Sequence, residues 1–135
     1  MRDLTDGTIT DRYLPVRVAN LSAVISISAG PGHTCASRAD GTVWCWGDNQ
    51  FGQLGRGTAG GASSFPEQVV APIYWPFPMG HLIRVIGIGL GNWGFHVCAD
   101  IDNDSVWCWG FNDYGQLGDG DLDDSSVPVR VIGLP

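Results

Sequence analysis

The sequence is poor in basic residues and contains no long apolar segment. Its 7 Lys and Arg residues stand against 14 Asp and Glu residues, which gives a formal net charge of −7. Because non-specific nucleic-acid binding depends on Lys and Arg contacts to phosphates, this balance argues against a nucleic-acid partner. No apolar run approaches the roughly 20 residues of a membrane-spanning helix, so we expect no membrane insertion. Residues 1–7 lack an apolar core, so we expect no signal peptide within this chain.

Helical periodicity and catalytic motifs are also missing. No segment repeats apolar residues at helical spacing, whereas short β-branched stretches alternate with Gly-rich turns, which predicts an all-β fold. Ser and His do not form a nucleophile motif, no Gly-rich phosphate loop precedes a helix, and the paired carboxylates fall in turns. We therefore expect neither enzymatic activity nor a cofactor.

What the chain does contain is an internal repeat. The stretch His33–Gly55 recurs as His96–Gly118, with His, Cys, Ala, Val, Trp, Cys, Trp, Gly, Asn, Gly, Gln, Leu and Gly at matching positions. Residues 4–18 match residues 117–131, so the chain starts part-way through a repeat. A match of this density predicts a repeat architecture.

The repeat divides residues 1–135, which we treat as one repeat segment. Residues 1–18 are the end of a truncated repeat, 19–69 are repeat one, and 70–131 are repeat two with an insertion at 70–81. We expect strands at 23–28, 34–38, 42–46 and 67–70 in repeat one, with Pro66 at a strand start, and the same plan in repeat two.

The hairpin in each repeat predicts a disulfide. A three-residue loop at Ala39–Gly41 places Cys35 directly opposite Cys45, and the same register in the second copy places Cys98 opposite Cys108. Opposed residues of an antiparallel pair have Cβ atoms about 4.5–5.5 Å apart, close to disulfide geometry. Four reduced, buried thiols are the alternative, and the wide cysteine spacing disfavours a zinc site. Two disulfides would indicate an oxidising compartment, extracellular or at the cell surface.

The same register places two tryptophans of each hairpin on the face opposite the cysteines. We interpret these residues as core between neighbouring sheets, and a ligand-stacking role is the alternative. They are Trp44, Trp46, Trp107 and Trp109. We expect the repeated Asn and Gln of the following loop to bind loop backbone, and His33 and His96 to be structural.

The motif as a whole resembles the regulator-of-chromosome-condensation repeat, in a cysteine-containing form similar to repeats of exported bacterial proteins. It runs from Gly32-His-Thr-Cys-Ala through Trp44-Cys-Trp-Gly to Gly52-Gln-Leu-Gly, followed by Pro66. The resemblance implies a β-propeller, usually of seven four-stranded blades. Members include a nucleotide-exchange factor, a β-lactamase inhibitor and a plant photoreceptor, so the fold alone does not fix the function.

About two and a half repeats cannot close such a ring. The remaining strand edges and Trp-rich faces would favour association. We therefore expect a homo-oligomer, as a ring or a filament, or else the remainder of a longer propeller, with another protein as a further possible partner.

Two features depart from the repeat. The insertion with its neighbouring Trp is an aromatic, Pro-stiffened candidate interface, although it could equally fold over its own blade. Its residues are Tyr74, Trp75, Phe77, Met79 and Trp93. The acidic turn Asp119–Asp124 resembles the start of a calcium loop, but Asp124 replaces its glycine and Arg130 its final Glu, so we prefer a solvated turn and expect no metal.

The sequence therefore predicts a non-enzymatic, disulfide-stabilised module for protein–protein interaction or self-assembly in an extracellular propeller-repeat protein. The alternatives are a carbohydrate-binding module that uses exposed Trp and Asp side chains, and a propeller fragment that inhibits an enzyme.

Overall fold

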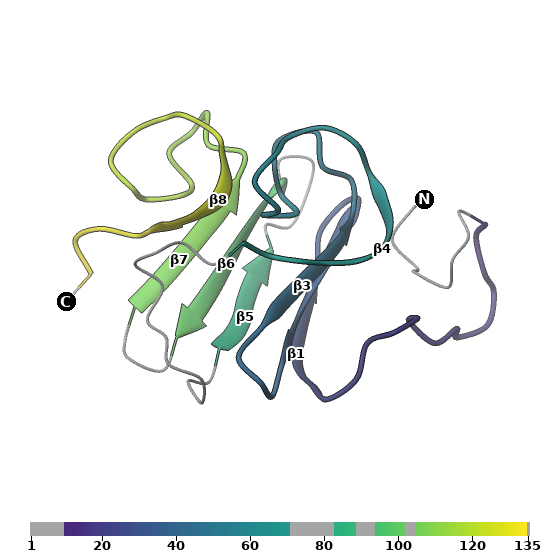
Figure 1. Ribbon diagram of the computed structural model, residues 1–135. Coiled ribbons are helices and arrows are strands. Elements are labelled where there is room, and N and C mark those ends of the chain that lie inside the picture. Colours follow the sequence, from purple (N-terminus) through teal and green to yellow (C-terminus); the bar gives the residue numbers. More distant parts are fainter. Residues whose placement is uncertain (1–9, 71–82, 89–93, 102–104, 135) are drawn as a thin grey trace.

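The described residues form two four-stranded antiparallel sheets (Figure 1). The computed structural model describes residues 10–70, 83–88, 94–101 and 105–134. Sheet one contains β1 (Val24–Ala29), β2 (His33–Arg38), β3 (Val43–Gly47) and β4 (Ser63–Gln68), and sheet two contains β5 (Ile83–Ile88), β6 (His96–Ile101), β7 (Ser105–Gly110) and β8 (Ser125–Arg130). The strands of each sheet lie in chain order. This confirms the predicted all-β fold, and the described residues include no helix able to span a membrane.

The central hairpins have the predicted register. Cys35 pairs with Cys45 in the β2–β3 ladder, and Cys98 pairs with Cys108 in the β6–β7 ladder. At the first turn the backbone N–H of Thr42 and its hydroxyl both donate to the Asp40 carboxylate, at 3.0 and 2.6 Å. These bonds lower the pKa of Asp40 and fix the turn that sets the register.

The outer strands correct one expectation. Pro66 lies inside β4 and Pro128 inside β8, whereas Pro66 was expected to start a strand at 67–70. Both strands are at the edge of their sheets and pair on one side only. A proline N atom that faces away from the ladder costs no hydrogen bond, so the strand continues through it.

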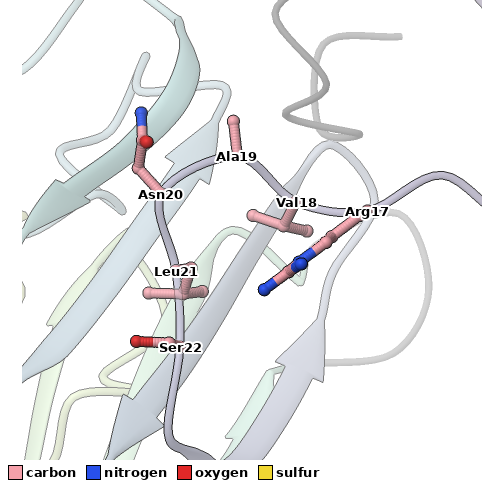
Figure 2. A pocket seen from close by; sticks show the side chains of 6 residues that line it. All are labelled: Arg17, Val18, Ala19, Asn20, Leu21 and Ser22. Carbon is pink, nitrogen blue, oxygen red and sulfur yellow. The ribbon is translucent and has the colours of Figure 1, made fainter.

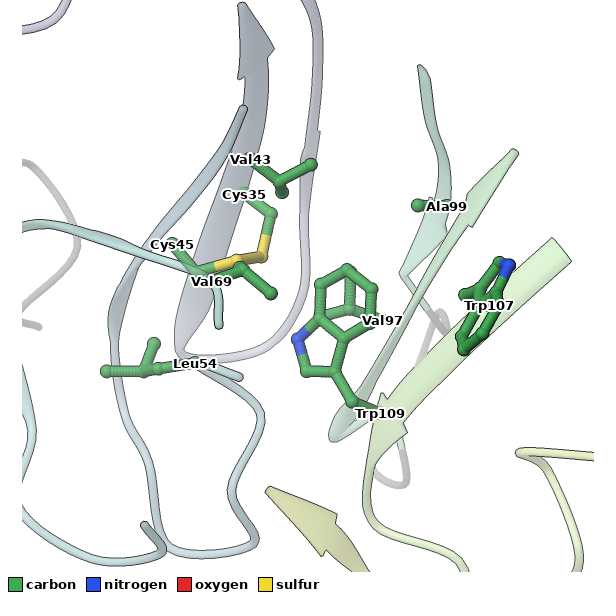
Figure 3. Packing of buried hydrophobic residues seen from close by; sticks show 9 residues of the cluster. All are labelled: Cys35, Val43, Cys45, Leu54, Val69, Val97, Ala99, Trp107 and Trp109. Atoms are coloured by element: carbon green, nitrogen blue, oxygen red, sulfur yellow. A yellow bond between two sulfur atoms is a disulfide. The ribbon is translucent and has the colours of Figure 1, made fainter. Parts of the chain in front are cut away.

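The two sheets stand side by side, and β1 and β2 contact β5 (Figure 1). Alternation along the strands gives each sheet two different faces. The disulfide face carries the cysteines, with Val43 of β3, and the indole face carries the tryptophans. Figure 3 shows the disulfide face of sheet one packed against Val97 and Trp109 on the indole face of sheet two.

Residues 10–22 precede the first sheet and contain no strand. Pro15–Val18 has the same four residues as Pro128–Val131, but only the second copy has a three-stranded sheet of its own beside it. Tyr13 and Leu14 are accordingly exposed. Figure 2 shows the end of this segment, where residues 17–22 line an open depression of about 570 Å³.

Candidate interaction face

The two sheets meet along an apolar seam of buried side chains. The Cys35–Cys45 disulfide is fully buried there, with a Cα–Cα distance of 4.1 Å. Val43 and Val69 flank the disulfide, and the Trp109 indole covers them from sheet two (Figure 3). At the seam, therefore, the disulfide face of one sheet packs against the indole face of the next sheet along the chain.

Hydrogen bonds between described residues join the sheets across the seam. The indole N–H of Trp109 donates to the Gln53 carbonyl at 2.9 Å, and the Gly57 N–H donates to the Ser126 carbonyl at 2.9 Å. Gly55 makes the first bond possible, because a Cβ at this position would lie 2.8 Å from the indole nitrogen. The Trp109 indole therefore fits here only because residue 55 is a glycine, and its N–H is satisfied by the backbone carbonyl of residue 53.

Side-chain amides hold the loop between β3 and β4, which contains Gln53 and Gly55, in place. The Asn49 side-chain oxygen accepts from the Leu54 N–H at 3.0 Å, and the Gln53 side-chain oxygen accepts from the Phe51 N–H at 2.8 Å. The second copy repeats both bonds, Asn112 with Leu117 at 2.9 Å and Gln116 with Tyr114 at 2.9 Å. The predicted structural role of the repeated Asn and Gln is confirmed.

An aromatic cluster that the sequence did not reveal closes one end of the seam. The Phe51 ring lies 5.2 Å from the Phe95 ring and 4.8 Å from the Phe111 ring. Gly32 and Asp48 occupy the positions of Phe95 and Phe111 in repeat one, so the cluster carries no repeat signal. The only hint in the sequence is that Phe51 directly precedes Gly52, the first of the loop glycines whose spacing recurs in repeat two.

His33 is buried at the same seam. The ring has no exposed surface and neither of its nitrogens has a hydrogen-bond partner among the described residues. Burial lowers the pKa of His33 to about 4, although the His96 backbone and the Asp48 carboxylate act in the opposite direction. Burial also lowers the pKa of His96, which is less enclosed. His33 is therefore neutral near pH 7, consistent with a structural role.

The disulfide face of sheet two has nearly the same residues, and no sheet among the described residues packs against it. We call this surface the open face. Six positions that are buried in sheet one are only half-buried here: His33 and His96, Cys35 and Cys98, Val43 and Val106, Gln53 and Gln116, Gly55 and Gly118, and Val69 and Val131. Cys108 and Leu117 remain buried by their own sheet and loop. The open face thus resembles the disulfide face of sheet one, but no described sheet covers it.

The predicted tryptophans and the second disulfide lie among the described residues, whereas the predicted interface of the insertion does not. Trp46, Trp107 and Trp109 are buried and Trp44 is half-buried. The candidate interface of the insertion lies outside the described residues: Tyr74, Trp75, Phe77, Met79 and Trp93. The Cys98–Cys108 disulfide has a Cα–Cα distance of 4.1 Å.

The acidic turn uses its carboxylates to hold its own loop. The Asn112 N–H donates to the Asp124 carboxylate at 2.8 Å, and the Asp123 N–H donates to the Asp121 carboxylate at 2.9 Å. The Asn112 side-chain amide donates to the carbonyls of Asp121 and Asp123. No group of three metal-ligating side chains occurs among the described residues.

Comparison with known proteins identifies the repeat. Two sequence profiles described as the regulator of chromosome condensation (RCC1) repeat match residues 24–53 and residues 40–99 with 103–135. The chain is 33% identical over 130 residues to the ultraviolet-B receptor UVR8 of Arabidopsis thaliana, which covers 95% of the chain and 27% of the receptor. It is 33% identical over 111 residues to the E3 ubiquitin-protein ligase HERC2 of Mus musculus, which covers 82% of the chain and 2% of the ligase.

Solved structures share the fold. Human WBSCR16 superposes with a TM-score of 0.73 at 23% identity, over 96% of this chain and 33% of that protein. Prp20p of Saccharomyces cerevisiae, described with its binding to Gsp1p and histones, superposes with a TM-score of 0.67 at 21% identity, over 88% of this chain and 29% of Prp20p. The chain therefore spans less than two thirds of each of these proteins, and its two sheets correspond to propeller blades.

Proposed function

Because the chain belongs to the regulator of chromosome condensation repeat family, we propose that it is a non-enzymatic, disulfide-stabilised module that assembles with other protein through its open face. Propellers of this family take part in protein–protein interaction. One observation carries the proposal: six positions that sheet two buries on sheet one are half-exposed on sheet two itself.

The chemistry of the open face favours a protein surface as its occupant. Val106 and Val131 are apolar and half-buried. In the loop after β7, Tyr114 and Leu122 are 72% and 62% exposed, and Tyr114 is the counterpart of Phe51, whose ring contacts Phe95 and Phe111 of sheet two. Contiguous exposed apolar side chains are typical of protein contacts, and Tyr is enriched at such contacts. A net charge of −7 makes a nucleic-acid partner unfavourable. A β-sheet with its own apolar face therefore fits best, and another copy of the chain can supply one.

The disulfides support an oxidising compartment, extracellular or at the cell surface. All four cysteines are paired and no described cysteine is free. Disulfides form and persist outside the reducing cytosol. Each bridge also restricts the unfolded chain of its hairpin, which stabilises the folded sheet.

Light scattering coupled to size exclusion tests the proposal on the oxidised chain. We expect masses above the 14.4 kDa of one chain that increase with concentration. Tyr114→Glu changes the counterpart of Phe51 and should reduce association, whereas Phe65→Glu should not, because Phe65 is an exposed aromatic residue on β4 of sheet one. A single 14.4 kDa species at every concentration would reject self-assembly.

A further inference from the structure

The segment before sheet one contains an acceptor motif for N-linked glycans. Asn20-Leu-Ser22 has the pattern Asn-x-Ser with no proline between its ends, and this pattern on a surface loop is a site of glycosylation in secreted proteins. Asn20 and Ser22 are both exposed, and Figure 2 shows their side chains on the segment that leads into β1. The two residues that the motif requires therefore lie at the surface.

The turn at Asn20 has a backbone conformation that recurs in the chain. Its φ angle is 60°, and Gly133, at the matching position after the second Pro-Val-Arg-Val stretch, has a φ angle of 79°. Asn is among the residues with a side chain that most readily adopt this left-handed conformation. Turn geometry alone thus explains an Asn at position 20. It does not explain the serine two residues later, because the residue that matches Ser22 is Pro135.

Hydrogen bonding leaves the motif free to react. Within the described part of the chain, residues 13–22 take part in one hydrogen bond, in which the Arg38 Nε donates to the Ser22 carbonyl at 2.8 Å. The Asn20 side-chain amide and the Ser22 hydroxyl have no partner among the same residues. Since a single exposed hydrogen bond opens at low cost, the segment can adapt to the active site of an enzyme while the sheets remain folded.

A second motif of the same pattern lacks this access. It is Asn103-Asp-Ser105, whose Asn103 lies outside the described residues. Ser105 is only 5% exposed, and its hydroxyl accepts from the Trp107 indole N–H at 3.1 Å. In the folded chain this hydroxyl is therefore closed to an enzyme, whereas the Ser22 hydroxyl is open to one. The two motifs form a matched pair within one chain.

We propose that Asn20 is an N-glycosylation site that accepts an oligosaccharide from a lipid pyrophosphate carrier. The side-chain nitrogen of Asn20 attacks C1 of the first sugar, so that an N–C1 bond forms while the C1–O bond to the pyrophosphate breaks. The amide loses one proton to the transferase, and the lipid pyrophosphate leaves with the electron pair of the broken bond. The proposal rests on the proposed oxidising compartment, because N-glycosylated motifs belong to secreted proteins, and it is independent of assembly through the open face.

The test offers the folded, oxidised chain to a purified oligosaccharyltransferase that recognises Asn-x-Ser/Thr, with a lipid-linked oligosaccharide as donor. Peptide mapping locates the glycan, and we expect it at Asn20 and not at Asn103. Asn20→Gly should abolish the modification without straining the turn, because glycine adopts a positive φ freely. Ser22→Ala should abolish it with the amide still present, and Ser22→Thr should retain it. An unmodified Asn20, or modification at Asn103 in its place, would overturn the proposal.

The reduced, unfolded chain is the control for access. We expect Asn20 to be modified at a similar rate in the folded and unfolded chains, and modification of Asn20 only after unfolding would also overturn the proposal. Light scattering reports separately on the proposed function. A glycosylated chain that keeps the mass of one chain would support this site and reject self-assembly, and an associating chain that is never glycosylated would do the reverse.

Discussion

Sheet one and sheet two have nearly the same sequence on their disulfide faces but different surroundings. Val43 is buried and Val106 is half-buried, although both precede the second cysteine of their hairpin. The difference comes from the sheet that covers each face, which is sheet two in one case and none of the described residues in the other. In a repeat protein, burial is therefore set by the neighbour, and equal residues need not contribute equally to stability.

The long loops extend the contrast. In sheet one the Arg56 guanidinium donates to the Glu67 carboxylate and to the carbonyls of Gly60 and Gly61. Asp119 occupies the matching position in sheet two and cannot donate in this way, whereas Asn49 and Asn112 donate to loop carbonyls in both sheets. The repeated Asn and Gln fix the loop in both sheets. The residue at the position of Arg56 differs between the two repeats.

Removing the covering indole should have the largest effect. Trp109→Ala leaves a cavity at the seam and an unsatisfied Gln53 carbonyl, so we expect a loss of about 3–5 kcal/mol in the free energy of unfolding. Urea denaturation measures it. Trp44→Ala is the matched control, because Trp44 is only half-buried and should cost clearly less. Equal losses would show that the seam is not the main source of stability.

Acid should have the second-largest effect, a loss in the free energy of unfolding caused by protonation of His33. The pKa of His33 is about 4 in the folded chain, against 6.5 in the unfolded chain, so only the unfolded chain gains this proton between these values. Stability is complete above pH 6.5 and falls towards pH 4, by about 3 kcal/mol at 1.36 kcal/mol per unit. Denaturation at several pH values should show this loss, and His33→Phe should remove most of it. His96→Phe should remove less, and the opposite order would contradict the burial difference.

The two disulfides should contribute equally to stability but differ in access. Each joins residues 10 apart, so loss of either should cost about 2–3 kcal/mol by the chain-entropy argument. Cys35 is fully buried whereas Cys98 is half-buried. Under native conditions a thiol reductant should therefore open Cys98–Cys108 first, which alkylation and peptide mapping would detect. Preferential opening of Cys35–Cys45 would mean that the seam does not protect it.

The loop contrast predicts the smallest effect. Arg56→Ala removes a half-exposed ion pair and hydrogen bonds to two carbonyls, so we expect a loss of about 1 kcal/mol. Asp119→Ala should change stability less, because the Asp119 carboxylate accepts only long bonds of 3.4 Å. Thermal unfolding of both variants measures the difference. A larger loss for Asp119→Ala would show that the acidic loop depends on its carboxylates.

The sequence predicted the hairpins well because their evidence is local. The offset between Cys35 and Cys45, taken with the turn at Asp40, determines which residues are opposed. The interior position of Pro66 was missed because only the sheet order shows that β4 is an edge strand. The open face could not be predicted, since Val43 and Val106 have the same sequence context and differ only in the sheet that covers them.

Hydrogen exchange at two matching glycine amides tests the open face most directly. The Gly57 N–H is bonded across the seam, and the Gly120 N–H occupies the same loop position on the open face. We predict that Gly57 is protected at every concentration, and that Gly120 exchanges freely in the dilute chain and becomes protected as the chain associates. Protection of Gly120 in the dilute chain, or free exchange at Gly120 in the associated chain, would contradict the proposed assembly through this face.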